Sequence, residues 1–168
     1  LTREQIEDIE SRVNNKYWWQ IYGSGERADR EGAIFTNWIM GEIDTTLPYC
    51  YGQDYGFTID PTTLVKVAVD EKKKIIYCDE LLYSTQSMGL DAILSTNKQL
   101  IAKPTDLIVA DSAEPRLIDD LKRKGLNIQG CVKGQGSVSA GISKMCDYQI
   151  VISSRSTNLR KELSNYVW

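Results

Sequence analysis

Two aspartates occupy positions at which their carboxylates would meet in a folded chain. Asp54 lies in the short segment GQDYG, and Asp111 ends the apolar run LIVAD at residues 107–111. If both runs are strands and the strands are parallel neighbours, the two side chains emerge near the carboxyl edge of one sheet, where open α/β sheets place their ligands. Two adjacent carboxylates repel each other unless a cation lies between them, so the pair indicates Mg²⁺ or Mn²⁺ held by oxygen ligands. Taken singly, each acid reads as an ordinary strand-end or capping aspartate.

The residue types that are missing narrow the chemistry further. The chain has no histidine, and its cysteines (Cys50, Cys78, Cys131 and Cys146) form no CxxC pair. The usual zinc ligand sets therefore cannot be assembled, and Ser-His-Asp and Cys-His catalysis are excluded. We expect the cysteines to be reduced core thiols, and any hydrolysis to depend on carboxylates, lysines and a metal ion.

Length and composition are those of a single globular domain. The 168 residues are 42% apolar and 26% charged, with no apolar run long enough to span a bilayer and no signal-peptide pattern at the start. We therefore expect a cytosolic protein without a membrane partner. The net charge is −3, but the charges are unevenly placed. Residues 1–111 hold 11 Lys/Arg against 18 Asp/Glu, whereas residues 112–168 hold nine Lys/Arg against five Asp/Glu. This asymmetry suits a cation site beside a phosphate-binding surface, although ordinary solvated faces explain it equally well.

The spacing of apolar residues predicts the elements that would position the two acids. A helix over residues 1–20 and a polar connector over residues 23–32 precede the main domain. In order, we then expect strands at Tyr49–Tyr55, Thr62–Asp70 and Lys74–Tyr83, a helix at Gln86–Lys98, a strand at Leu107–Asp111, a helix at Pro115–Lys124, a strand at Asn127–Val132, a helix at Ser137–Cys146, a strand at Tyr148–Ile152 and a helix at Thr157–Val167. This order predicts an α/β fold with a mixed sheet flanked by helices, antiparallel at one edge and parallel elsewhere. It is similar to the order found in ribonuclease H-like domains.

Several longer motifs, in a fixed order along the chain, carry a more specific resemblance. They are EGAIFTNW at residues 31–38, YGQDYGFTIDPTTLVKVAVD at 51–70, LIVADSAEPRLIDDLKRKGLNIQG at 107–130, CVKGQGSVSAGISKM at 131–145 and RSTNLRKELSNYVW at 155–168. Together they resemble the nuclease domain of the large terminase subunit of bacteriophage DNA-packaging motors, over essentially the whole chain. The resemblance implies a ribonuclease H-like fold in which Asp54 and Asp111 are the first two catalytic, metal-binding acids.

The activity implied by the resemblance is that of a metal-dependent endodeoxyribonuclease that cuts concatemeric viral DNA. Hydrolysis of the phosphodiester would use two ions, Mg²⁺ or Mn²⁺, of which one activates water and the other stabilises the leaving oxygen. The implied partners are double-stranded DNA, the small terminase subunit and the portal of the procapsid. The implied location is the cytoplasm of the infected bacterial host.

The metal site implied by the resemblance is incomplete in this sequence. The family adds a further aspartate on a helix beyond the segment NYVW, and the sequence ends at Trp168, so we expect the third acid outside it. Asp147 precedes its strand and should lie at the opposite edge of the sheet. Asp60 and Glu114 could support the metal ligands, but Asp60 reads mainly as a turn residue before Pro61, and Glu114 equally as an acid favoured at a helix start.

Packaging motors of this family also contain an ATPase domain, which requires the phosphate loop GxxxxGK[ST]. The segment KGQGSVSAG has the glycines but lacks the lysine at the needed place. We therefore expect residues 1–32 to be a helix and connector from a missing ATPase domain. Residues 33–168 would be the nuclease domain, without the C-terminal helix that carries the last catalytic acid.

Basic residues in the C-terminal part are candidates for DNA binding. Lys133, in the glycine-bearing loop, and Arg155 are predicted to contact DNA phosphates, with an ordinary solvated role as the alternative for each. Arg160 and Lys161 read more simply as a solvated helix face.

Three other functions remain open. The segment DYGFTIDPTT also fits the first phosphate loop of actin-like or sugar-kinase ATPases, but these need a second glycine-rich loop, and ADSAEPR contains no glycine. Another ribonuclease H-like nuclease, of the resolvase or transposase type, would use the same acids. A non-catalytic DNA- or capsid-docking module would explain a site that lacks its third acid.

Overall fold

The computed structural model describes residue 3, residues 32–56 and residues 59–167. All of the predicted N-terminal helix except Arg3, and all of the predicted connector except Gly32, therefore lie outside the described residues. The chain divides into two compact units, and only their described residues are discussed below. Unit 1 is formed by residues 1–47, 69–78 and 136–168, and unit 2 by residues 48–68 and 79–135. Both predicted metal-binding acids, Asp54 and Asp111, belong to unit 2.

Within the described residues, seven strands form one mixed sheet in the order β1-β7-β4-β3-β2-β5-β6. Their bounds are β1 Trp38–Met40, β2 Tyr49–Asp54, β3 Thr62–Asp70, β4 Ile75–Ser84, β5 Ile108–Ala110, β6 Ile128–Gly130 and β7 Gln149–Ile152. β2 pairs with β3 in antiparallel and with β5 in parallel orientation, β5 runs parallel to β6, and β7 runs parallel to both β4 and β1. The predicted mixed sheet is confirmed. Its antiparallel strands lie in the middle rather than at one edge, because β5 and β6 extend the sheet beyond β2 while β7 and β1 extend it beyond β4.

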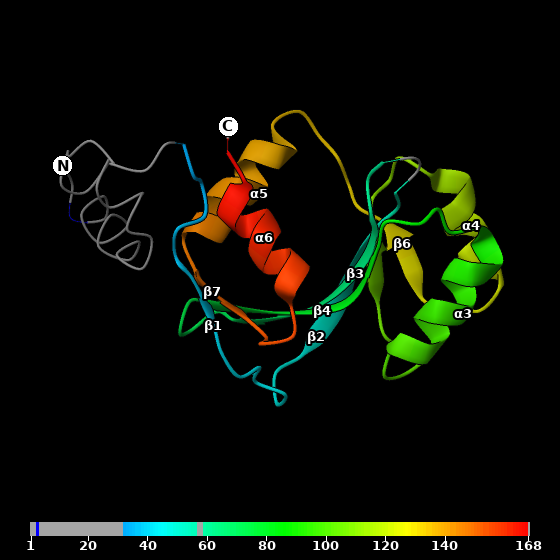
Figure 1. The fold of residues 1–168 in the computed structure, drawn as a ribbon, viewed down its shortest axis with the longest axis horizontal. Helices are drawn as coiled ribbons and strands as arrows, with labels where there is room; N and C mark the ends of the chain where they lie inside the picture. Colours follow the sequence, from blue (N-terminus) through cyan, green and yellow to red (C-terminus); the bar gives the residue numbers. More distant parts are fainter. Residues whose placement is uncertain (1–2, 4–31, 57–58, 168) are drawn as a thin grey trace. The chain divides into compact units, whose positions relative to one another are not determined.

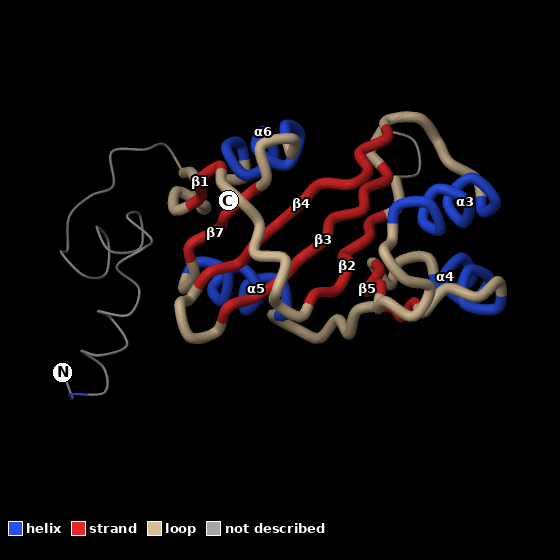
Figure 2. Tube along the Cα trace, turned by 90° about the horizontal axis from the view of Figure 1, so that it is seen from below, coloured by secondary structure: helices blue, strands red, loops and turns tan. Residues whose placement is uncertain are grey.

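The helices of unit 2 cover the strands that carry the two acids. They are α3 (Leu90–Leu100) and α4 (Pro115–Arg123), which lie side by side against the strands in Figure 1 and Figure 2. The core between helices and strands includes Tyr51, Leu64, Ile93, Ile101, Ile108, Leu121 and Ile128. Pro115 suits the first turn of α4 because its φ is fixed, and Gly125 follows the helix with a φ of +99°, a conformation that favours glycine.

In unit 1, β7 is the buried strand, with α5 (Ser137–Cys146) and α6 (Thr157–Asn165) on the same side of β7 and β1 (Figure 1). Tyr148, just before β7, is only 1% exposed, and its hydroxyl donates a hydrogen bond to Glu71. The ammonium groups of Lys74 and Lys144 lie 4.9 and 5.2 Å from the centroid of the Tyr148 ring. This cluster ties the turn between β3 and β4 to the start of β7.

The structure differs from the predicted elements at several bounds and in one strand that was missed. The helix predicted from Gln86 begins at Leu90, because Gly89 is extended, with φ −77° and ψ 169°. The last helix ends at Asn165 rather than Val167, since Val167 forms a bridge with Ala33 instead. Strand β1 was not predicted at all; it has three residues and exists through its pairing with residues 150–152.

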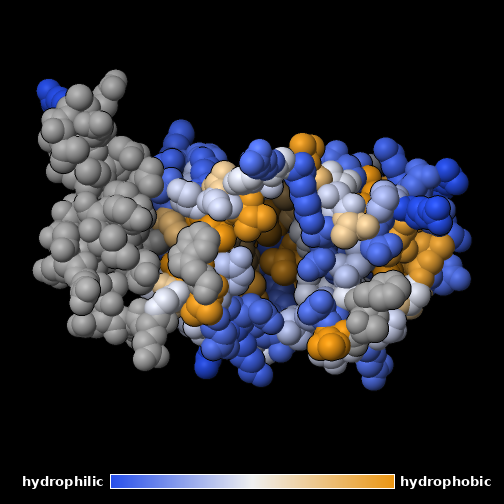
Figure 3. Space-filling model, turned by 90° about the horizontal axis from the view of Figure 1, so that it is seen from above, coloured by the Kyte–Doolittle hydropathy of each residue, from blue (hydrophilic) through white to orange (hydrophobic). Residues whose placement is uncertain are grey.

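The surface is mainly hydrophilic on the face that Figure 3 shows, with hydrophobic residues gathered in smaller patches. The exposed large hydrophobic residues include Ile59 at 88% and Val132 at 96%, both in loops of unit 2. In the part of the chain that the structure describes, no helix combines the length and the apolar character needed to cross a membrane.

Candidate metal centre

Asp54 and Asp111 are brought together by the parallel pairing of β2 with β5. Gln53 pairs with Ala110 in the register of the two strands, and the N–H of Asp111 donates to the carbonyl of Gln53 at 2.9 Å. Asp54 follows Gln53 and Asp111 follows Ala110, so the two acids lie at the same edge of the sheet. The expectation that the two strands are parallel neighbours is confirmed.

The two acids line an open depression of about 380 Å³ in unit 2. Its other lining residues are Gly52, Gln53, Thr63, Val65, Val109, Ala110 and Cys131. These other residues are glycine, aliphatic residues and uncharged polar residues, and Asp54 and Asp111 supply the carboxylates of this lining. Two carboxylates that line one depression favour a cation beside them.

The chain turns sharply after Asp54, and Gly56 makes that turn possible. A Cβ atom added to Gly56 would lie 1.7 Å from the carbonyl oxygen of Asp60, so no other residue fits without moving the backbone. The N–H of Gly56 donates to the hydroxyl of the buried Thr62 at 3.1 Å, and the N–H of Tyr55 donates to Asp54 Oδ1 at 2.9 Å. These contacts hold the backbone that follows Asp54, whose side chain is exposed.

The carboxylate of Asp111 has two kinds of partner. The N–H of Ala113 donates to Oδ1 at 2.7 Å, and Lys133 Nζ donates to both Oδ1 at 2.8 Å and Oδ2 at 2.7 Å. The hydrogen bond from Lys133, followed by that from Ala113, lowers the pKa of Asp111 below its ordinary value. The same bond to Asp111 is the largest cause that raises the pKa of Lys133, and the charge of Asp54 adds a smaller contribution in that direction. Asp111 and Lys133 are therefore a charged pair at neutral pH.

The oxygen donors of this pair fit a divalent cation in type but are few in number. Carboxylates are the ligands that Mg²⁺ and Mn²⁺ prefer, and both acids line the same depression. Among the described residues, however, no group of three or more His, Cys, Asp or Glu could hold a metal ion. Asp54 and Asp111 can thus hold an ion only with water or with a ligand from elsewhere completing its coordination.

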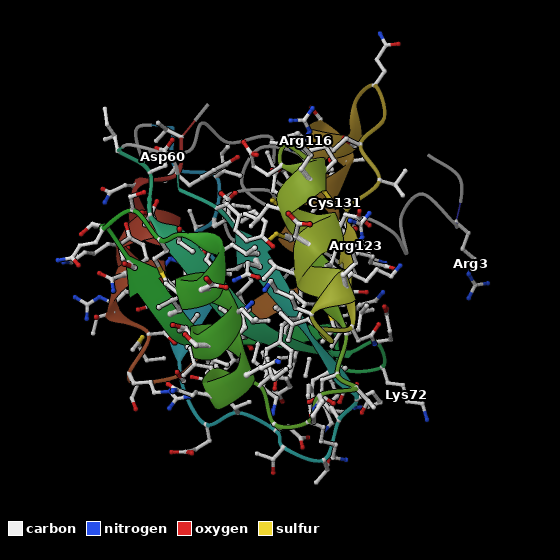
Figure 4. The ribbon with its side chains drawn as sticks, turned by 90° about the vertical axis from the view of Figure 1, so that its right-hand side faces the viewer. Arg3, Asp60, Lys72, Arg116, Arg123 and Cys131 are labelled. Carbon is white, nitrogen blue, oxygen red and sulfur yellow. The ribbon has the colours of Figure 1, made fainter. Side chains whose placement is uncertain are left out.

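Of the other predicted site residues, Lys133 contacts this pair through Asp111. The ammonium of Lys133 is bound to Asp111 in this structure, and the contact of Lys133 with phosphate stays a prediction. Arg155 is exposed in the loop between β7 and α6 and belongs to unit 1. Asp60 is exposed in the loop that leads into β3, and Figure 4 shows it apart from Cys131, which lines the depression. Glu114 is the residue before α4 and makes no side-chain capping hydrogen bond.

A buried amide pair behind the site was missed by the sequence reasoning. Gln53 Nε2 donates to Asn97 Oδ1 at 3.0 Å, and Asn97 Nδ2 donates to Gln53 Oε1 at 2.8 Å. Gln53 is 5% exposed and Asn97 is 0% exposed. The signal was present in the sequence, because Asn97 lies four residues from both Ile93 and Ile101 on the apolar face of α3.

None of the four cysteines, all of them described, forms a disulfide, as predicted. Cys78 and Cys146 are buried, and burial raises the pKa of the Cys78 thiol to about 12. Cys50 and Cys131 are only half-buried, so the prediction of core thiols is correct for two of the four.

This chain is similar to domains of bacteriophage proteins. A family model described as the terminase RNAseH-like domain matches residues 54–168. The large terminase subunit of Bacillus phage SPP1 is 31% identical over 96% of this chain, and the match covers 40% of that protein, so the chain spans less than half of its length. The manganese-bound nuclease domain of the SPP1 large terminase has a TM-score of 0.69 at 27% identity, over 80% of this chain and 81% of that domain. The magnesium-bound large terminase nuclease of the thermophilic phage G20c shares the fold, with a TM-score of 0.58 at 18% identity over 82% of each chain.

Proposed function

We propose that this chain, which belongs to the family of terminase ribonuclease H-like domains, is a metal-dependent endodeoxyribonuclease that cuts concatemeric viral DNA. Family membership makes it a C-terminal nuclease domain of a phage large terminase subunit. The observation that carries the proposed activity is the meeting of Asp54 and Asp111 at one edge of the sheet, where β2 and β5 end side by side. The metal-bound relatives support the use of Mg²⁺ or Mn²⁺.

In the proposed mechanism, Asp54 and Asp111 would hold the divalent ions. Bound ions of this kind activate water and stabilise the leaving oxygen of a phosphodiester. The role of the chain is to fix both carboxylates, through the strand pairing and through the tight turn at Gly56. Two carboxylates alone do not suffice for two ions, and we therefore place a further acidic ligand outside the described residues. Residues 33–168 would then be the nuclease domain without its last acid, and residues 1–32 its connection to an ATPase domain.

The proposed substrate is double-stranded DNA, and the proposed partners are the small terminase subunit and the portal of the procapsid. Lys133 and Arg155 are the basic residues that we propose for contact with phosphates, and Asp60 and Glu114 remain candidates to support the metal ligands. The setting would be the cytoplasm of the infected bacterial host. These assignments rest on the family and on residue chemistry.

Family membership decides between several of the functions that the sequence left open. It sets aside an actin-like or sugar-kinase ATPase and a nuclease of the resolvase or transposase type. A docking module with a degenerate site is still favoured by one observation, because only two acids meet among the described residues. Mutation of these two acids separates a nuclease from such a module.

The first prediction is that Asp54→Asn and Asp111→Asn each abolish cleavage of supercoiled plasmid while the fold is retained. Loss of a group that merely supports a metal ligand costs about 10–100-fold, so loss of a direct ligand should reduce the cleavage rate by roughly 100-fold or more. Cleavage should be measured with the intact large subunit in Mg²⁺ and in Mn²⁺. Isothermal titration of Mn²⁺ into this chain would report the same ligands without turnover.

The matched control is Asp119→Asn on α4, which also removes one carboxylate from unit 2, but one paired with Arg123 at the surface. It should cut at the wild-type rate. Near wild-type cleavage by either Asp54→Asn or Asp111→Asn would remove that residue from the catalytic site. If both variants cut normally, the docking module is the better function.

A further inference from the structure

In the candidate metal centre, Asp111 forms an ion pair with Lys133. Lys133 Nζ lies 2.8 Å from Oδ1 and 2.7 Å from Oδ2 of Asp111, so one ammonium occupies both oxygens of the carboxylate. The side chains of Lys133 and Asp111 are 49% and 31% exposed. A lysine is thus bound at the position where the proposed function requires a metal ion.

The parallel pairing of β5 with β6 brings this lysine to the site. Ala110 pairs with Gly130, and the N–H of Cys131 donates to the carbonyl of Ala110 at 2.8 Å. The chain therefore leaves β6 at the edge where β5 presents Asp111. Residues 132–136 form an exposed loop that ends at Gly136, whose φ is +78°. A side chain on such a loop can move away without disturbing the core.

The ammonium and a divalent ion compete for the same oxygens. A Mg²⁺ or Mn²⁺ ion bound by Asp111 needs at least one carboxylate oxygen at a bond length shorter than a hydrogen bond, and its charge repels an ammonium held on the same group. We propose that Lys133 is the resident counter-ion of the acid pair, which a divalent ion must displace from Asp111 before the metal centre can form.

This role differs from a simple phosphate contact. A lysine that only binds DNA has no effect on metal affinity while DNA is absent, whereas a counter-ion lowers that affinity even in the free protein. Displacement also gives an order of events, because the ammonium becomes available to a DNA phosphate only after the ion has taken Asp111. The inference rests on the proposed function, since it requires Asp111 to be a metal ligand.

The test is a titration of Mn²⁺ into the DNA-free chain by calorimetry, with variants at Lys133. Lys133→Met removes the charge but keeps the length of the side chain, and it should bind Mn²⁺ about three- to tenfold more tightly, because an exposed ion pair no longer has to be broken and a nearby positive charge is gone. Lys133→Gln is a second neutral variant with the same expected gain. Lys133→Arg keeps the charge and should stay close to wild type.

The matched control is Lys122→Met on α4, which changes the net charge equally but lies exposed on the helix surface. It should leave Mn²⁺ affinity unchanged. If both neutral variants at Lys133 bind Mn²⁺ no more tightly than wild type while Asp111→Asn loses binding, the counter-ion role is wrong and the metal centre stands. If Asp111→Asn binds Mn²⁺ as well as wild type does, the metal centre itself is wrong, and the counter-ion role fails with it.

Discussion

Tyr55, the residue after Asp54, carries a buried hydroxyl that has no hydrogen-bond partner among the described residues. Burial raises the pKa of Tyr55 above its ordinary value, so the phenol is neutral at all pH values of interest. A buried donor without a partner has lost its hydrogen bonds to water and gains none from the protein. The aromatic ring of Tyr55 packs against the core of unit 2, and its hydroxyl costs stability there.

We therefore expect Tyr55→Phe to be as stable as wild type or more stable by up to about 1 kcal/mol in free energy of unfolding. Tyr49→Phe is the matched variant, because the hydroxyl of Tyr49 donates to Asp106 Oδ2 at 3.0 Å, and its removal should lower the free energy of unfolding. Urea denaturation of the two variants measures both changes. A clear loss of stability in Tyr55→Phe would mean that its hydroxyl has a partner outside the described residues.

At the scale of elements, the amide pair between β2 and α3 holds the strand that carries Asp54. Gln53 uses its side chain to bind Asn97 and its carbonyl to accept the N–H of Asp111. One residue thus links the helix, the strand and the neighbouring strand end. Because the pair lies in an apolar core, each amide satisfies the other, and neither can lose its partner without being left unpaired.

Asn97→Leu should destabilise the protein by about 1–3 kcal/mol, since it leaves the buried amide of Gln53 without a partner. The double variant Gln53→Met with Asn97→Leu replaces both amides by apolar groups and should be more stable than the sum of the single changes predicts. Urea denaturation of the four proteins gives this coupling directly. Asn165→Leu at the exposed end of α6 is the control, with an expected change within about 0.5 kcal/mol. Additive single changes would show that the two amides do not act as a pair.

The sequence pattern predicted most of the elements and the pairing of the two strands that carry Asp54 and Asp111. Asp54 ends β2 and Asp111 follows the apolar strand β5, and the consecutive strand and helix patterns predict which elements are present. The partners of these residues were not predictable, because Lys133 is 22 residues from Asp111 and Asn97 is 44 residues from Gln53. Such contacts depend on strand register and on which strands are neighbours. The same limit explains the missed strand β1 and the central position of the antiparallel strands.

At the scale of the whole molecule, the charge of the chain bears on the DNA binding that we propose. The net charge is −3, so attraction to DNA cannot come from an overall positive charge. It must come from local groups, and the basic part of the chain, residues 112–168, holds nine Lys/Arg against five Asp/Glu. Lys133 in unit 2 and Arg155 in unit 1 are the two positions that we assign to phosphate contacts.

Replacing both Lys133 and Arg155 by alanine should weaken DNA binding equally for unrelated sequences and reduce its dependence on salt. Each lost phosphate contact removes about 0.9 from the slope of log affinity against log salt concentration, so the double variant should lose roughly two. Fluorescence anisotropy with duplex DNA in Ca²⁺ measures this, because Ca²⁺ takes oxygen ligands and frees Lys133 from Asp111 if the counter-ion role is correct. The control is Lys98→Ala with Lys122→Ala, which removes the same charge from exposed positions on α3 and α4. If the control flattens the salt dependence as much as the test variant does, binding follows total charge, and neither Lys133 nor Arg155 is a specific phosphate contact.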